Sequence, residues 1–130
     1  MNTKAKHPGR VLVMDDEKSV QLLLERVLTG AGHTVSVVDS GEAALAALDH
    51  ETFDLMIADK NLPDVDGLEV IRLARSKHPA LQTVVITGFP TPESKQKAQS
   101  LGAHAFITKP FGVVEICDAA LNREGVGAAN

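Results

Sequence analysis

The chain has 130 residues, of which 44% are hydrophobic and 23% charged, a composition that fits one folded domain and excludes a disordered or collagen-like chain. The formal net charge is −4, and three basic side chains lie among the first ten residues, so the rest of the chain is more acidic still. An acidic chain without Trp or Tyr argues against direct binding of nucleic acid or of an anionic membrane. The single Cys117 permits no internal disulfide and favours a cytoplasmic location, and no apolar run is long enough to span a membrane.

Five short apolar runs are expected to form β-strands. Residues 11–14 are apolar throughout and end at Asp15, which is typical of a strand that is buried on both faces. The later runs are similarly short and end at polar residues or turn signals. The expected strands cover residues 11–14, 33–38, 53–58, 82–86 and 104–108.

Helical patterns separate these strands. Residues 17–29 place apolar side chains on one face and are followed by glycines that stop a helix. Capping patterns that begin at Asp39 and Asp66 predict the next two helix starts. Thr91 is expected to cap the fourth helix, with Pro92 in its first position.

The last helix is expected to turn one apolar stripe toward the sheet and to leave a second apolar pair free. Ile116 and Ala119 lie off the stripe and are candidates for a partner surface. The residues expected to face inward are Val113, Cys117, Ala120 and Leu121.

This alternation predicts an α/β domain built from five βα units. A doubly wound parallel sheet with helices on both faces is the expected architecture. We expect residues 1–9 to be a polar basic leader, residues 10–124 the domain, and residues 125–130 a flexible tail or the start of a linker.

Polar residues that carry chemistry follow four of the predicted strands. Ligands of an open parallel sheet bind beyond the carboxyl ends of its strands. Three carboxylates gathered there would repel one another by about 4 kcal/mol per pair at ~4 Å, so a lysine and a divalent cation are expected as compensation. An all-oxygen site suits Mg²⁺, with Mn²⁺ as an alternative, and a carboxylate beside such charges is a good phosphoryl acceptor. The residues concerned are Asp15, Asp16, Asp59, Thr87 and Lys109.

The sequence resembles the receiver domains of two-component response regulators, which are CheY-like proteins. The resemblance implies a flavodoxin-like three-layer sandwich with strand order 2-1-3-4-5. The motifs that carry it are Asp15-Asp16, Asp59, Leu62-Pro63, Asp66-Gly67, Thr87-Gly88 and residues 106–111.

The resemblance also implies roles for individual residues. Asp59 would accept the phosphoryl group, Lys109 would contact one phosphoryl oxygen, and Thr87 would hydrogen-bond another. Phe106 would turn inward when Thr87 moves, and the bond before Pro110 would be cis. Mg²⁺ would be held by Asp15, Asp16, Asp59 and the backbone carbonyl of Asn61.

Such a protein is a phosphorylation-controlled switch and not an enzyme with its own substrate. The implied partners are a histidine kinase or a histidine phosphotransfer protein as donor, and an output domain or target protein. The target would bind the surface of the fourth helix, the fifth strand and the last helix. A homodimer is a further option.

Two alternatives remain open at this point. A degenerate receiver would act only as a scaffold. A phosphatase of the haloacid-dehalogenase type would need Asp-x-Asp after the first strand, and Asp15-Asp16-Glu17 lacks the second Asp at that spacing.

Asn61 and Phe89 also depart from the residues common in receivers, and Pro90 and Pro92 make the loop after Thr87 unusually rich in proline.

Overall fold

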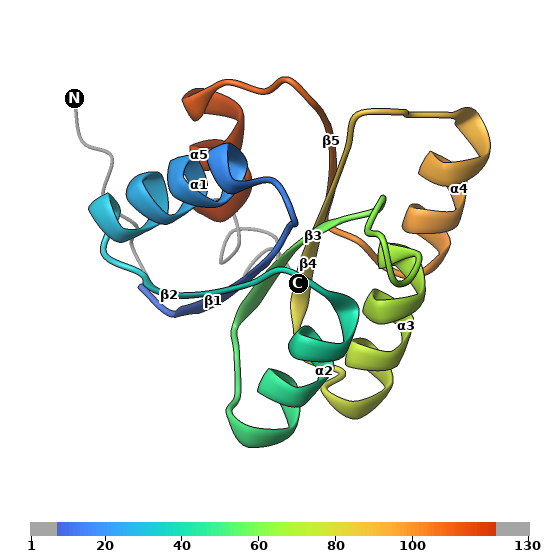
Figure 1. Ribbon diagram of the computed structural model, residues 1–130, viewed down its shortest axis with the longest axis horizontal. Coiled ribbons are helices and arrows are strands. Elements are labelled where there is room, and N and C mark those ends of the chain that lie inside the picture. The colour runs from blue at the N-terminus through green and yellow to red at the C-terminus, as the bar shows by residue number, and fades with distance from the viewer. Residues whose placement is uncertain (1–7, 122–130) are drawn as a thin grey trace.

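The structure, a computed structural model, describes residues 8–121 and has a parallel sheet at its centre (Figure 1). The strands follow the order β2-β1-β3-β4-β5, and each neighbouring pair is parallel, which confirms the expected topology. Residues 1–7 and 122–130, and the side chain of Leu121, lie outside the described part, so the expectations for them stay predictions. The strands are β1 (Arg10–Met14), β2 (Thr34–Val38), β3 (Leu55–Asp59), β4 (Gln82–Thr87) and β5 (Ala105–Thr108).

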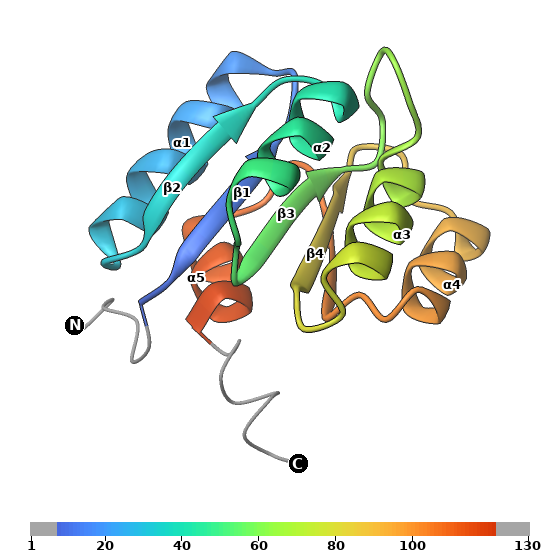
Figure 2. The same cartoon turned by 90° about the horizontal axis from the view of Figure 1, so that it is seen from below.

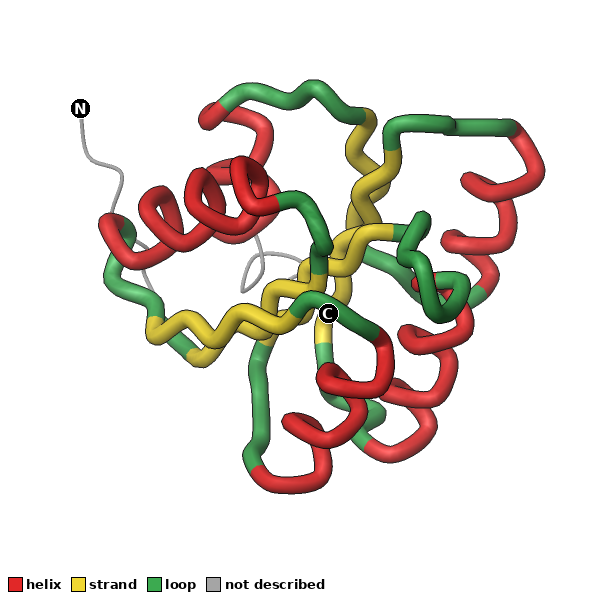
Figure 3. The backbone as a smooth tube through the Cα atoms, viewed as in Figure 1, coloured by secondary structure: helices red, strands yellow, loops and turns green. Residues whose placement is uncertain are grey.

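Five helices cover the sheet in two layers. The layer on one face holds the first and last helices, and the layer on the other face holds the middle three, as Figures 2 and 3 show. No helix among the described residues is long and apolar enough to cross a membrane. The helices are α1 (Lys18–Gly30), α2 (Gly41–His50), α3 (Gly67–Lys77), α4 (Pro92–Ser100) and α5 (Val113–Leu121).

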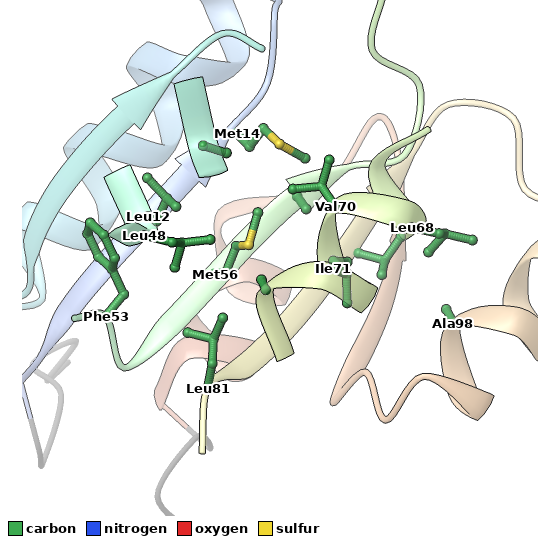
Figure 4. Packing of buried hydrophobic residues seen from close by; sticks show 14 residues of the cluster. Leu12, Met14, Leu48, Phe53, Met56, Leu68, Val70, Ile71, Leu81 and Ala98 are labelled. Atoms are coloured by element: carbon green, nitrogen blue, oxygen red, sulfur yellow. The ribbon is translucent and has the colours of Figure 1, made fainter. Parts of the chain in front are cut away.

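The central strands feed two separate cores. In β1, Leu12 and Met14 pack beneath α2, α3 and α4, and Val11 and Val13 pack beneath α1 and α5. This alternation follows from the two-residue period of a strand. Because both faces of β1 are buried, its sequence is a continuous apolar run rather than an alternating one. Figure 4 shows the first of these cores.

The rotation of α5 differs from the prediction. Ala120 is 2% exposed, as predicted, but Ile116 is also buried, at 1%, and packs in the core beneath α1, whereas Val113 is 47% exposed. Ala119 is also packed against this core, so the predicted partner pair is wrong. The helix is apolar on several sides, and packing against α1 rather than sequence periodicity decides which side faces the sheet.

Two of the three predicted helix starts are confirmed. The side chain of Asp66 accepts a hydrogen bond from the N–H of Leu68, and Thr91 forms a reciprocal capping box with Ser94. Helix α2 is capped one residue later than predicted, by Ser40. In each case a side-chain oxygen satisfies an N–H group that the first helical turn leaves free.

Asp64 ties the loop after β3 to the start of α2. Its two carboxylate oxygens accept hydrogen bonds from the N–H groups of Gly41 at 3.2 Å and Glu42 at 3.3 Å. A Cβ atom at position 41 would lie 2.2 Å from Cγ1 of Val65, so only glycine allows the loop to approach this closely. The loop is therefore anchored to a helix that is distant from it in sequence.

We expect Asp64→Ala to lower the free energy of unfolding by about 1 kcal/mol, the usual contribution of a helix cap. Urea unfolding of the two proteins measures this difference. Asp39→Ala is the matched control, because this exposed carboxylate lies near the same helix end without capping it. Equal losses in both variants would contradict the cap.

His104, just before β5, provides a pH test of the fold. Its ring Nδ1 is buried without a hydrogen-bond partner among the described residues. Burial, with the charge of Arg75 nearby, lowers the pKa of His104 below its ordinary value of 6.5. The unfolded chain therefore binds this proton more readily than the folded chain, so the stability falls as the pH drops below 6.5.

His104→Gln should remove this part of the pH dependence. Urea unfolding of wild type and variant at a series of pH values between neutrality and mild acid measures it. We expect the difference in stability between the two proteins to shift in favour of the variant as the pH falls. A difference that is constant with pH would contradict the assignment.

Candidate functional site

Four of the predicted site residues meet at one edge of the sheet. Asp15 follows β1, Asp59 and Thr87 end β3 and β4, and Lys109 follows β5. Asp15 and Thr87 are 0% exposed and Asp59 is 3% exposed. Parallel strands end at the same edge, so residues far apart in sequence come together there.

The ammonium group of Lys109 lies among three carboxylates. Its Nζ is 3.0 Å from Oδ2 of Asp15, 3.1 Å from Oδ2 of Asp59 and 2.5 Å from Oε1 of Glu17. The lysine side chain is 13% exposed and its partners Asp15 and Asp59 are buried, so these two contacts are shielded from water, whereas the contact with Glu17 is exposed. One cation thus bridges the ends of β1, β3 and β5.

Glu17 is the member of this cluster that sequence reasoning missed. It occupies the N-cap position of α1, yet its side chain makes no capping hydrogen bond and reaches Lys109 instead. The N–H of Glu17 donates to Oδ1 of Asp15 at 2.8 Å, which fixes the turn between strand and helix. A third consecutive acid after Asp15 and Asp16 was the signal available in the sequence.

The charges in this cluster act on one another. Burial raises the pKa of Asp15, and the nearby charge of Asp59 adds to this, against the opposing hydrogen bonds from the Glu17 N–H and Lys109. Burial alone would lower the pKa of Lys109, but its hydrogen bonds to Glu17, Asp15 and Asp59 outweigh this and raise it. The lysine therefore keeps its charge, and three acids share a single cation.

The backbone around Asp59 leaves no room for a side chain at position 67. A Cβ atom there would lie 2.0 Å from the carbonyl oxygen of Asp59, which explains the glycine after Asp66. The N–H of Gly67 donates to the carbonyl of Lys60 at 2.8 Å and closes the loop. The carboxylate of Asp59 accepts a hydrogen bond from the N–H of Asn61 at 2.9 Å.

The oxygen donors at this edge fit a divalent cation of the Mg²⁺ type. One carboxylate oxygen from each of Asp15, Glu17 and Asp59 lies within 4.8 Å of the others. Asp16 is exposed and is not one of these three; it lines a pocket of about 570 Å³ together with Lys60 and Asn61. An excess of carboxylate oxygens without nitrogen or sulfur ligands suits a hard cation.

The predicted switch residues Thr87 and Phe106 lie on the neighbouring strands β4 and β5. The hydroxyl of Thr87 donates to Oδ1 of Asn61 at 2.7 Å, a contact that no sequence motif indicated. Phe106 in β5 is half-buried and packs against the core beneath α3 and α4. The Lys109–Pro110 peptide bond is cis.

Lys109→Met should lower the free energy of unfolding by roughly 2 kcal/mol, the scale of one hydrogen bond between charged groups. The physical reason is that three clustered carboxylates would lose their only cation among the described contacts. Urea unfolding without divalent cations measures the loss.

Lys77→Met is the control for that experiment, because Lys77 pairs with Asp49 at 2.8 Å in an exposed position. A salt bridge in water contributes little, so we expect a clearly smaller loss. A loss as large as that of Lys109→Met would contradict a special role for the Lys109 cluster.

Comparison with known proteins identifies relatives of this chain. The family of response regulator receiver domains matches residues 11–121. The chain is 35% identical over 107 residues to the DNA-binding transcriptional regulator NtrC of Salmonella typhimurium. The matched region covers 82% of this chain and 23% of NtrC. It thus spans about a quarter of the length of this relative.

Solved structures agree with the family match. A CheY-like receiver domain from Methanospirillum hungatei superposes with a TM-score of 0.88 at 23% identity, covering 95% of this chain and 100% of that one, which shows the shared fold. A response regulator from Burkholderia pseudomallei, with a phosphorylated aspartic acid and a calcium ion, gives a TM-score of 0.80 at 28% identity over 92% of this chain and 71% of that one. The chain belongs to the response regulator receiver domains, the phosphorylation-dependent signalling modules of two-component systems.

Proposed function

We propose that Asp59 accepts a phosphoryl group from a histidine kinase or a histidine phosphotransfer protein and that this modification switches the protein. The observation that carries the proposal is the contact between the buried Asp59 carboxylate and the Lys109 ammonium at 3.1 Å. Such a pair combines a nucleophile with a fixed positive charge where negative charge grows during transfer.

The chemistry of the step is a simple displacement. A carboxylate oxygen of Asp59 forms a bond to phosphorus, and the bond from phosphorus to the donor nitrogen breaks, its electron pair remaining on the donor imidazole. Lys109 stays protonated throughout, because its neighbours raise its pKa, and it stabilises the transferred group. The N–H of Asn61, which donates to Asp59, orients the attacking carboxylate.

A divalent cation, when bound, supplies the positive charge that the acidic edge needs beyond Lys109. Asp15, Asp16, Asp59 and the backbone carbonyl of Asn61 are its proposed ligands. The proximity of Asp15, Glu17 and Asp59 supports a cation at this place and adds Glu17 as a further candidate. The calcium ion of the Burkholderia pseudomallei relative is consistent with this proposal.

The proposed switch runs from Thr87 to the surface. Phosphoryl oxygens on Asp59 would offer new acceptors to the Thr87 hydroxyl, and Phe106 would follow the movement inward. Reversing an equilibrium from 1:99 to 99:1 needs about 5.5 kcal/mol of differential interaction. Hydrogen bonds to charged groups contribute roughly 1.5–3 kcal/mol each, so about two to four of them suffice.

The surface of α4, β5 and α5 is the proposed output. Helix α4 buries only Ser94 and Ala98 and lies at the edge of the molecule beside α3 (Figure 1), so it can move at low cost. The exposed Val113 and Val114 extend this surface at the start of α5.

The proposed binding partner of this surface is an output domain in the same polypeptide or a separate target protein. Because this chain covers 23% of NtrC, a DNA-binding regulator by name, a longer protein with a DNA-binding output is one form of the proposal. A homodimer that forms through the same surface is a further form of the proposal. A cytoplasmic location stays a prediction.

The direct test is labelling with a small acyl phosphate or phosphoramidate in the presence of Mg²⁺. We expect the intact mass to rise by one phosphoryl group in the wild type and not in Asp59→Asn. Asp49→Asn makes the same chemical change at an exposed site on α2 and should label like the wild type.

The labelling experiment also separates the alternatives. A wild-type chain that remains unmodified with Mg²⁺ would contradict the proposal and favour a scaffold without phosphotransfer. Labelling that persists in Asp59→Asn would place the acceptor at another residue.

A further inference from the structure

The hydroxyl group of Thr87 makes two hydrogen bonds in the structure, and one of them uses its only proton. It donates to Oδ1 of Asn61 at 2.7 Å and accepts a hydrogen bond from the N–H of Phe89 at 3.0 Å. Thr87 is 0% exposed, so water offers no replacement for either contact. A hydroxyl has a single proton to donate, and here it is directed to Asn61.

Asn61 thereby connects the acceptor to the switch. Its own N–H donates to the carboxylate of Asp59 at 2.9 Å, while its side-chain oxygen holds Thr87. Thr87 can donate to a phosphoryl oxygen on Asp59 only after it has left Asn61. The two acceptors compete for the same proton.

We propose that the hydrogen bond from Thr87 Oγ1 to Asn61 Oδ1 is a latch that holds the unphosphorylated arrangement. This inference rests on the proposed function, because the competing acceptor is the phosphoryl group on Asp59. Asn61 is a positioning residue: its side chain acts on the switch through Thr87. The free energy of this hydrogen bond must be overcome before Thr87 can donate to the phosphoryl group, so it weakens the apparent binding of that group.

The surroundings show that the latch is not needed to hold the loop in place. Asp64 anchors the loop to α2, and Gly67 closes it against Lys60. A bridge between Asn61 and Asp66 adds backbone pairing inside the loop. Asn61 itself is exposed, so an apolar residue at this position removes the acceptor without opening a cavity in the core.

The test uses beryllofluoride, a phosphoryl mimic, with Mg²⁺ and four proteins: wild type, Asn61→Leu, Thr87→Val and the double variant. Leucine has nearly the shape of asparagine without an acceptor, and valine has the shape of threonine without the hydroxyl. We expect Asn61→Leu to bind beryllofluoride roughly three- to tenfold more tightly than wild type, the effect of one neutral hydrogen bond. In the Thr87→Val background, the same substitution should leave the affinity unchanged.

A second readout needs neither metal nor phosphoryl mimic. In the nuclear magnetic resonance spectrum of the free protein, the amide signal of Phe89 reports on Thr87, to which it donates. We expect Asn61→Leu to move this signal toward its position in beryllofluoride-bound wild type, because loss of the latch shifts the resting population.

The outcomes are distinct. Unchanged or weaker binding by Asn61→Leu, or a gain of equal size in the Thr87→Val background, overturns the latch and leaves the proposed function intact. A Phe89 signal that stays at the wild-type position also overturns it. If the wild type itself binds no beryllofluoride and accepts no phosphoryl group, the proposed function fails, and the latch fails with it.

Discussion

The contact of one ammonium group with three carboxylates is the constraint around which this edge of the molecule is built. Lys109 follows β5, and its partners Asp15, Glu17 and Asp59 come from the ends of β1 and β3, so the ion pairs draw the loops after three strands together. The acids still outnumber the lysine, and the remaining negative charge is what makes this edge suited to a divalent cation. The same lysine is in place to stabilise a phosphoryl group on Asp59.

The fold and the main site residues could be predicted because each depends on local pattern and on a general property of parallel sheets. Apolar runs ending in Asp15 and Asp59 indicate strands buried on both faces, and the strand ends must share an edge. The rotation of α5 could not be predicted, since that helix is apolar on several sides and Ile116 is selected by contact with α1. Its periodicity carried no decisive information.

Other parts of the site depend on contacts between distant segments. Glu17 reads as an ordinary first-turn acid, and only the position of Lys109 turns its side chain away from capping. Asp64 reads as a turn residue, yet it caps α2 across the fold. The hydrogen bond between Asn61 and Thr87 joins the loop after β3 to the end of β4, and no spacing in the sequence predicts which way either side chain points.

The measurement that tests the central claim most directly is a crystal structure of the protein with Mg²⁺ and beryllofluoride. The beryllofluoride should be bonded to a carboxylate oxygen of Asp59, with Nζ of Lys109 in contact with a fluorine and the Thr87 hydroxyl moved from Asn61 to another fluorine. A beryllofluoride group on a different residue, or one on Asp59 without contact to Lys109, would contradict the idea that this lysine and this acid form the phosphoryl-accepting pair.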